Sequence, residues 1–197
     1  MQTTLIVVFS YLVGSISTAV LVSRLMALPD PRTGGSGNPG ATNVLRLGGK
    51  KAGALTLLGD VLKGVLPVLI AKQVSDSDAV VVGAAVAAFL GHLYPVFLSF
   101  KGGKGAATAL GVVAALSWPV GLAISATWLL VAAVSRYSSL ASILAALTAP
   151  LYATWMGQSI AVVLGMIAMS ALLIMRHQAN IARLVAGNES KIGASSS

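Results

Sequence analysis

The sequence predicts an all-helical, polytopic membrane protein with about seven transmembrane helices in a single domain, residues 1–191. Three observations point to this class. The 197 residues are 56% hydrophobic, only 9% are charged, and the mean hydropathy is +0.89. A soluble core of this length needs more polar surface, and a bilayer forces each spanning segment to satisfy its own backbone hydrogen bonds. Because a spanning helix needs about 20 apolar residues, a large domain outside the membrane is excluded.

The expected helices follow the apolar runs in chain order, at residues 3–27, 52–72, 79–98, 106–117, 118–135, 139–156 and 159–175. The first run begins almost at Met1 without a basic stretch before it, so we interpret it as a retained span rather than a removed signal peptide. The fourth and fifth runs are short and meet at Ser117, just before Pro119, which removes a helix donor. They form either two packed spans, which we favour, or one re-entrant hairpin.

Charge predicts the orientation of the chain. Lys and Arg number 13 against 5 Asp and Glu, a net charge of +8. Most of the positive residues fall between the first two helices, between the third and fourth, between the fifth and sixth, and after the seventh. The positive-inside rule then places the N-terminus outside and the C-terminus in the cytoplasm. The small, polar tail at 192–197 is expected to be disordered.

Composition also excludes several kinds of site. Cysteine is absent, so there is no disulfide, thiolate nucleophile or cysteine metal site. Two histidines without a nearby carboxylate cluster fall short of the usual metal ligand sets. We therefore expect no metal and no cofactor.

The longest polar segment, residues 30–46, joins the first two helices. Its run GGSGNPG is permissive backbone around a proline turn, which allows consecutive amides to point into one concavity. A helix from Ala41 onward would place Asn43 and Arg46 on one face, with Arg46 able to bind a phosphate bidentately. The uncharged donors of this segment are Ser36, Asn38 and Thr42. A flexible linker is the alternative, but it has no use for this combination of polar residues.

The second segment is FKGGKGAAT, residues 100–108. It is not a Walker A loop, because Leu98 stands where that pattern needs glycine and Gly105 where it needs Ser or Thr. Its glycines still allow an anion to approach the backbone, Lys104 supplies a charge, and a helix beginning near Ala106 would direct its N-terminal amides to the same point. A positive anchor at a helix end is the alternative, and it would require the lysine but not three glycines.

The third segment, residues 176–191, follows the last span. In a helix, His177 and Asn180 lie three residues apart on one face and Arg183 follows one turn later, so the three side chains can share a pocket. Histidine is the natural proton carrier near neutral pH. Glu189, beyond a break expected at Gly187, is interpreted as structural, in an ion pair with a loop arginine.

Other polar residues lie close to these segments. Asp60 and Lys63 are three apart inside the second helix, where a pair facing the bundle interior avoids an unpaired charge in lipid. His92 lies near the cytoplasmic end of the third helix and could contact either loop. All three are expected to be structural. Ser138 and Ser139 are expected to cap the sixth helix, and Ser139 could also offer a hydroxyl to the site.

Taken together, SGNPGATNVLR, GHLYPVFLSFKGGKGAAT and RHQANIARL with NESK closely resemble, in order and spacing, the three motifs of the bacterial acyl-phosphate:glycerol-3-phosphate acyltransferase family. The resemblance covers essentially the whole chain. It implies a seven-helix inner-membrane enzyme with a cytoplasmic active site that makes lysophosphatidic acid (1-acyl-glycerol-3-phosphate) and releases inorganic phosphate in phospholipid biosynthesis. The implied partners are acyl-phosphate, glycerol-3-phosphate and membrane lipid, with no nucleic acid and with functional coupling to the enzyme that makes acyl-phosphate.

The resemblance also assigns roles to residues. The catalytic residues it implies are Ser36, Arg46, Lys104, His177 and Asn180. The residues expected to bind substrate are Gly37, Asn38, Thr42, Asn43, Gly102, Gly103, Gly105, Thr108 and Ser139.

Direct acyl transfer is the expected mechanism, because acyl-phosphate is a mixed anhydride with a good leaving group and mainly needs positioning and charge neutralisation. A substrate phosphate or His177 could take the proton. A covalent acyl intermediate on Ser36 remains an alternative. The His-x4-Asp dyad of the other large glycerolipid acyltransferase class is missing, because Phe97 and Ala182 stand where its aspartate would follow each histidine. The competing functional class is a small membrane transporter of phosphorylated solutes.

Overall fold

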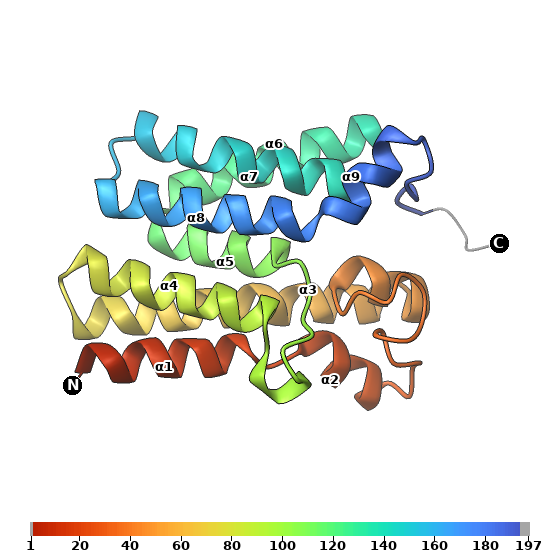
Figure 1. Cartoon of the computed structure of the whole chain (residues 1–197), viewed down its shortest axis with the longest axis horizontal. Coiled ribbons are helices and arrows are strands. Elements are labelled where there is room, and N and C mark those ends of the chain that lie inside the picture. The colour runs from red at the N-terminus through yellow and green to blue at the C-terminus, as the bar shows by residue number, and fades with distance from the viewer. Residues whose placement is uncertain (1, 194–197) are drawn as a thin grey trace.

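The computed structural model describes residues 2–193, which contain nine α-helices, one 3-10 helix and no strand (Figure 1). The elements are α1 (Gln2–Gly14), α2 (Thr18–Leu25), α3 (Ala41–Val74), α4 (Asp78–Leu93), η1 (Val96–Leu98), α5 (Ala106–Leu116), α6 (Trp118–Ser135), α7 (Ser138–Trp155), α8 (Ile160–Arg176) and α9 (Gln178–Val185). The prediction of an all-helical chain is therefore confirmed for the described residues. Apart from Ile192 and Gly193, the predicted disordered tail lies outside them.

Each predicted apolar run corresponds to helix, and three differ in detail. The run 3–27 is broken between α1 and α2, which meet at an angle of 42°. The run 79–98 ends its α-helix at Leu93 and continues as η1. The run 52–72 is the longer part of α3, which is kinked at Gly49, where φ is 76°. Between α5 and α6 the chain breaks at Ser117, with Pro119 in the first turn of α6, as the sequence predicts.

Within residues 2–193, fewer helices than the seven expected are long and apolar enough to span a membrane. In the described residues, α3, the stretch Asp78–Leu98 and α6 are long and apolar enough to cross a membrane. The count rises to five if α1 with α2, and α8 with α9, each form one bent span. The helix α5 has only 11 residues. The seven-span count and the orientation in the membrane therefore remain predictions.

Glycines let two pairs of helices pack closely. A Cβ at Gly14 or Gly91 would clash with backbone atoms across the α1–α4 contact, and one at Gly64 or Gly111 would clash across the α3–α5 contact. Small residues at crossings are the usual means of bringing membrane helices together, since lipid provides no hydrophobic drive for their association. These contacts fix α5 against α3 and so fix the start of α5.

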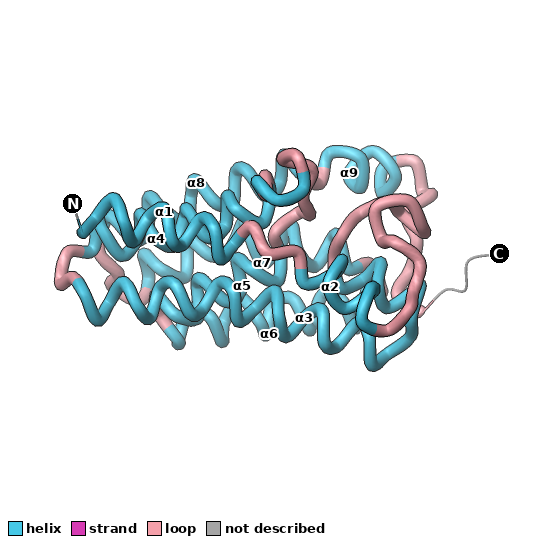
Figure 2. The backbone as a smooth tube through the Cα atoms, turned by 90° about the horizontal axis from the view of Figure 1, so that it is seen from below, coloured by secondary structure: helices cyan, strands magenta, loops and turns pink. Residues whose placement is uncertain are grey.

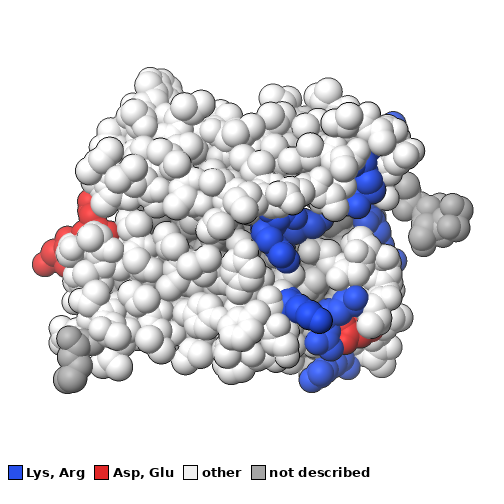
Figure 3. Space-filling view, in the orientation of Figure 1, with Lys and Arg blue, Asp and Glu red and all other residues white. Residues whose placement is uncertain are grey.

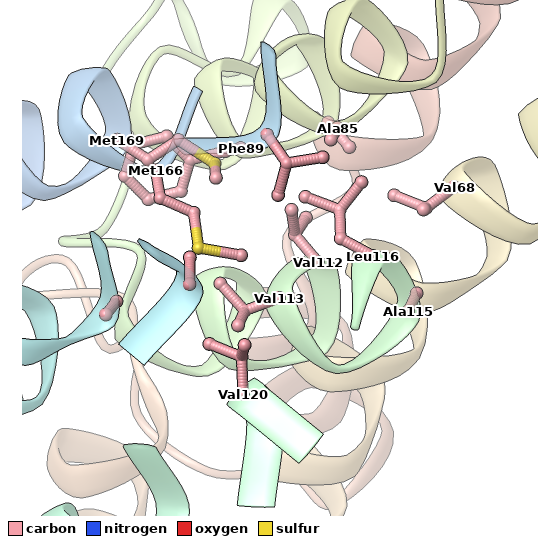
Figure 4. Close-up of a cluster of buried hydrophobic side chains, with 14 of the residues drawn as sticks. Val68, Ala85, Phe89, Val112, Val113, Ala115, Leu116, Val120, Met166 and Met169 are labelled. Carbon is pink, nitrogen blue, oxygen red and sulfur yellow. The ribbon is translucent and has the colours of Figure 1, made fainter. Parts of the chain in front are cut away.

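The apolar core lies mainly between α4, α5, α7 and α8. Phe89, Val112, Val113, Met166 and Met169 are buried within it (Figure 4). Close packing of this kind leaves few voids in protein interiors. A large cavity beside this core is therefore a specific feature of the fold.

The helices run along the long axis of the molecule, and the long connections gather toward one end (Figures 1 and 2). Lys and Arg side chains cluster around a hollow on that half of the surface, with some acidic surface among them, and further acidic side chains lie at the opposite end, where the α3–α4 turn lies (Figure 3). Lys72 at that opposite end donates hydrogen bonds to the carbonyl oxygens of Ala115 and Leu116, at the C-terminus of α5. The fold therefore brings the basic, glycine-rich segments to one end of the bundle.

Candidate functional site

One cavity of about 610 Å³ connects the three polar segments with the interior of the helix bundle. Its polar lining includes Ser36, Asn38, Thr42, Asn43, Arg46, Asp60, His92, Lys104, Ser139, His177, Asn180, Arg183 and Glu189. All five predicted catalytic residues are in this set. They come from the loop between α2 and α3, from α3, from the loop before α5, from the junction of α8 and α9, and from α9, so only the folded chain brings them together.

The cavity continues into an apolar interior between α5, α6, α7 and α8. The apolar residues that line it include Leu110, Val113, Ile124, Trp128, Ala145, Ala146, Ala149, Met169 and Leu173. Leu57 and Leu129 also line the cavity and are 47% and 63% exposed, so the apolar part reaches the lipid-facing surface of the bundle. A site with a charged mouth and an apolar interior suits a ligand that is itself amphipathic.

Asn43 holds the first polar segment in shape. Its side-chain oxygen accepts a hydrogen bond from the amide of Ser36 at 2.8 Å, and its NH₂ group donates to the carbonyl oxygens of Pro31 at 2.9 Å and Gly34 at 3.0 Å. The side chain is buried, so its amide group is used by these hydrogen bonds to the loop. Arg46, one turn further along α3, is exposed and, among the described residues, makes no hydrogen bond or ion pair. Arg46 lines the cavity, and its binding of a phosphate stays a prediction.

The second segment packs against α4. It is held there by Arg176, which the sequence did not single out. Arg176, at the end of α8, donates to the carbonyl oxygens of Gly102 at 3.0 Å and Gly103 at 3.3 Å. The amide of Gly103 donates to the carbonyl oxygen of His92 at 3.2 Å. Gly102 and Gly103 do not line the large cavity, and their glycine identity has a packing reason, since a Cβ on either would clash with His92.

Gly105 sits directly before α5 and borders the cavity. Its φ of +87° is a conformation that L side chains rarely adopt, and a Cβ would also clash with Phe89. Ala106 and Ala107 line the cavity after it. Amides of a first helical turn have no partner within the helix, so the start of α5 presents donors and the positive end of its dipole near Lys104.

Lys104 is part of a chain of hydrogen bonds that ties the second segment to the third. Its Nζ donates to the side-chain oxygen of Asn180. The NH₂ group of Asn180 donates to Oε1 of Glu189 at 2.6 Å, which also accepts from the Ser139 hydroxyl at 2.7 Å. Arg183 donates to Oε2 of Glu189 at 2.7 Å. The predicted ion pair of Glu189 is formed, but its partner is Arg183 of α9 rather than a loop arginine. The chain turns at Gly187, where φ is +72°.

Two ionisable groups of this hydrogen-bonded network, Lys104 and Glu189, have shifted pKa values. Burial lowers the pKa of Lys104 to about 8; Glu189 opposes this shift, whereas Arg183, Arg46 and Arg176 add to it. For Glu189, burial raises the pKa, but hydrogen bonds from Ser139, Asn180 and Arg183 outweigh it and the net shift is downward. Lys104 thus lies among several cations and binds its proton less tightly than a free lysine, and a bound anion would raise its pKa.

His177 lies between α8 and α9 and is buried against the cavity. Its Nδ1 is 2.8 Å from the carbonyl oxygen of Leu173. Because a carbonyl only accepts, Nδ1 carries a proton, and in the neutral ring Nε2 is then an acceptor. Nε2 is therefore the ring nitrogen that can receive a proton, but burial lowers the pKa of His177 to about 4, so the imidazole is a weak base at neutral pH.

The predicted cap of the sixth expected helix is wrong. Tyr137 is the N-cap of α7, and no side chain caps this helix end. The Ser138 hydroxyl instead lies 3.2 Å from the hydroxyl of Thr42, and the Ser139 hydroxyl donates a hydrogen bond to Glu189. Both serines line the cavity, since the first turn of α7 faces the mouth rather than solvent.

The remaining predicted residues divide into two groups. Asn38, Thr42, Asn43, Gly105 and Ser139 border the cavity, whereas Gly37, Gly102, Gly103, Thr108 and Lys63 do not. Among residues 2–193, no group of three or more His, Asp or Glu could hold a metal ion. Sequence reasoning missed the role of Arg176 and the apolar interior. A signal for the interior was present, because Ser142, Ala145, Ala146 and Ala149 form a small-residue stripe at helical spacing.

Comparison with known proteins gives concordant results. A family model described as glycerol-3-phosphate acyltransferase matches residues 4–187. A glycerol-3-phosphate acyltransferase of Methylococcus capsulatus is 56% identical, with 96% of each chain covered, and one of Paraburkholderia phymatum is 54% identical, with 98% of this chain and 94% of the relative covered.

Two solved structures are also similar to this chain. Both are of PlsY, an integral membrane glycerol 3-phosphate acyltransferase, in its glycerol 3-phosphate form (TM-score 0.94, 45% identity) and in its lysophosphatidic acid form (TM-score 0.90, 44% identity). In each case 98% of this chain and 96% of the other are covered.

Proposed function

Because this chain belongs to the glycerol-3-phosphate acyltransferase family and is an integral membrane acyltransferase, we propose that its acyl donor is an acyl-phosphate and its product lysophosphatidic acid. The supporting observation is the single cavity that joins a cationic mouth to an apolar interior. Two phosphates and one fatty chain need both environments at once. The glycerol 3-phosphate and lysophosphatidic acid forms of the similar solved structures agree with this acceptor and product.

The reaction is a direct transfer. The 1-hydroxyl oxygen of glycerol-3-phosphate attacks the carbonyl carbon of acyl-phosphate and forms an ester bond. The bond between that carbon and the phosphate oxygen breaks, and inorganic phosphate leaves with the bonding electrons. The hydroxyl proton passes to a phosphate oxygen or to Nε2 of His177. In the described residues the Ser36 hydroxyl has no hydrogen bond to a histidine or a carboxylate, which favours direct transfer over a covalent acyl-Ser36.

The protein contributes binding, charge and exclusion of water. Arg46, Lys104 and the start of α5 neutralise phosphate charge, and Asn180 holds Lys104 in position. The apolar interior holds the acyl chain, and the lipid-exposed Leu57 and Leu129 mark where a chain can pass in from the bilayer. The two reacting groups then meet at the boundary between polar mouth and apolar interior, where positioning is most effective.

The experiment supplies purified protein in lipid or detergent with acyl-phosphate and glycerol-3-phosphate. Phosphate release and lysophosphatidic acid, followed by mass spectrometry, should require both substrates and be lost in Lys104→Ala, and acyl-CoA should not replace acyl-phosphate. A folded preparation that releases no phosphate would refute the donor. An acyl-enzyme trapped with acyl-phosphate alone would refute direct transfer.

We place the active site on the cytoplasmic side of the inner membrane, with the positive-inside distribution as support. The natural chain lacks cysteine, so single cysteines report accessibility without background. Asn188→Cys near the cavity mouth should be labelled by an impermeant thiol reagent only after the cytoplasmic side is opened, and Ser77→Cys in the α3–α4 turn should be labelled in intact cells. The reverse pattern would overturn the orientation. Coupling to the enzyme that makes acyl-phosphate stays a prediction.

A further inference from the structure

A buried ionic cluster lies at the inner side of the cavity, where it makes contacts with α2, α3, α4 and α5. Asp60 and Lys63 of α3 form an ion pair at 2.9 Å, and their side chains are only 3% and 6% exposed. Lys63 also donates to the carbonyl oxygen of Ile16 at 2.7 Å, which is exposed by the break between α1 and α2. Thr18 donates to Oδ1 of Asp60.

His92 connects this cluster to α5. Its Nδ1 is 3.6 Å from Oδ1 of Asp60 and 3.1 Å from the hydroxyl of Thr108. At 3.6 Å the contact with Asp60 is electrostatic rather than a hydrogen bond, so the hydrogen bond that orients the ring is the one to Thr108. The cluster thereby fixes the orientation of the His92 ring.

His92 also supports the glycine loop that contains Lys104, through a hydrogen bond and close packing. The carbonyl oxygen of His92 accepts from the amide of Gly103, and the ring packs so closely that a Cβ on Gly103 would clash with Nε2. On the other side of Lys104, Gly105 packs against Phe89 and Leu93, also of α4. One turn of α4 therefore contacts the backbone on both sides of Lys104, and we call this contact the clamp. His92 is its polar member, before Lys104, and Phe89 and Leu93 are its apolar members, after Lys104.

We propose that Asp60 and His92 are positioning residues of the acyltransferase, which hold the loop 101–105 so that Lys104 meets the phosphate of a substrate. The inference rests on the proposed function in that Lys104 binds phosphate, and it adds two residues that the sequence had suggested were only structural. Asp60 acts through His92, and His92 acts through the backbone of Gly102 and Gly103, directly before Lys104.

A purely structural role makes a different prediction. Removing one partner of a buried ion pair leaves an uncompensated charge and destabilises a protein, whereas removing both is often tolerated. If the cluster only neutralised charge, the double variant Asp60→Asn, Lys63→Met would recover both stability and activity. If Asp60 positions the loop, that variant recovers stability but binds phosphate more weakly.

Two threonines of the cluster provide a matched comparison. Thr108→Val removes the hydroxyl that contacts His92, and Thr18→Val removes the hydroxyl that donates to Oδ1 of Asp60. Neither residue lines the large cavity. Each change removes a single buried hydroxyl with little change in shape, so their losses of thermal stability should be comparable.

The measurement is the Kd for inorganic phosphate by calorimetry on purified, folded protein, together with KM and kcat for glycerol-3-phosphate. We expect Thr108→Val and Asp60→Asn, Lys63→Met each to weaken phosphate binding by about tenfold or more, with Thr18→Val within about twofold of the natural protein. Combining Thr108→Val with the double charge change should give less than the product of their effects, because both act through His92.

Equal phosphate affinity in Thr108→Val and Thr18→Val would overturn the proposal, as would full phosphate affinity in a folded double charge variant. If the latter does not fold, the threonine pair alone decides. The phosphate Kd does not depend on the acyl donor, so a failure of the donor proposal appears as absent turnover in the natural protein and is distinguishable from a failure here.

Discussion

Lys104 donates a hydrogen bond to the side-chain oxygen of Asn180, a residue 76 positions further along the chain. The contact joins the glycine loop before α5 to α9, and Asn180 in turn donates to Glu189. A lysine at the mouth of the cavity is thus fixed in place without being neutralised by a direct carboxylate contact. It keeps its charge for a ligand.

The first prediction concerns the alkaline side of the pH profile. Burial lowers the pKa of Lys104 to about 8, so its charged form is present below that pH and is lost as the pH rises through it. Because a phosphate binds the charged form, kcat/KM for glycerol-3-phosphate should fall above pH 8, by about tenfold for each further pH unit. The measurement is kcat/KM between pH 6.5 and 9.5.

Lys104→Arg is the control for that prediction. A guanidinium stays charged throughout this range, so the variant should have lower activity but should lose the decline above pH 8. A profile in Lys104→Arg that falls at the same pH as in the natural protein would show that another group titrates.

The second prediction concerns Glu189, which accepts hydrogen bonds from Ser139, Asn180 and Arg183. In Glu189→Gln one oxygen becomes an NH₂ group that faces donors, so we expect a loss of about 1–3 kcal/mol in unfolding free energy and a lower Tm. Its pKa is lowered on folding, so the carboxylate contributes stability above the ordinary value of 4.5 and that stability is lost as the pH falls below it. The variant should lack this acid-side loss in Tm.

Asp30→Asn is the comparison for Glu189→Gln. Asp30 pairs with Arg32 on the surface, where both side chains are about one-third exposed, and such pairs contribute about 0–1 kcal/mol. Equal effects of the two substitutions on Tm would contradict a special role for the Glu189 network.

The helices could be predicted from sequence because lipid leaves an apolar run few alternatives to a helix. The break at 15–17 could not, because it depends on a distant partner: the freed carbonyl of Ile16 is stabilised by Lys63. The ion pair of Asp60 with Lys63 was predictable from its spacing, whereas the connection to His92 required knowledge that α3 and α4 pack side by side.

The candidate site shows the same division. Arg46, Lys104, His177 and Asn180 could be chosen by residue type, because a phosphate site needs cations and donors. Asn43 has the same chemistry but faces its own loop, and Gly102 and Gly103 are required by the His92 contact. Residue type indicates what a side chain can bind. Only the fold decides whether that side chain faces a ligand or forms its hydrogen bonds within the protein.

The third prediction concerns the inner end of the cavity. Along each lining helix the residues furthest from the polar mouth are Val113, Ile124, Ala149 and Met169. Ala149→Leu adds bulk there and should shorten the acyl chain that fits. Each buried methylene is worth about 0.8 kcal/mol, roughly fourfold in affinity, so losing two should reduce kcat/KM for palmitoyl-phosphate by about tenfold or more relative to a dodecanoyl donor.

Two variants test the assignment of Ala149. Ala126→Leu adds the same bulk on the exposed face of α6 and should leave the chain-length ratio unchanged. Met169→Ala enlarges the inner end and should favour longer donors. If Ala149→Leu slows all chain lengths equally, this position does not limit chain length.

The last prediction separates backbone strain from packing at Gly105. Gly105 and Gly157 both have positive φ, +87° and +69°, but a Cβ at Gly105 would clash with Phe89 and Leu93, whereas one at Gly157 would meet nothing within 4 Å. Gly157→Ala should therefore cost only the strain, about 1–2 kcal/mol, and leave kcat/KM unchanged, since it lies in the turn between α7 and α8. Gly105→Ala should cost more, because it also displaces the start of α5.

Thermal unfolding and steady-state kinetics on both alanine variants provide the measurement. Because Gly105 adjoins Lys104 and borders the cavity, we expect Gly105→Ala to weaken glycerol-3-phosphate binding as well as to lower Tm. Equal losses of Tm in the two variants, with normal kinetics in both, would mean that the start of α5 tolerates the displacement. The clamp of α4 on the glycine loop would then not determine where Lys104 lies.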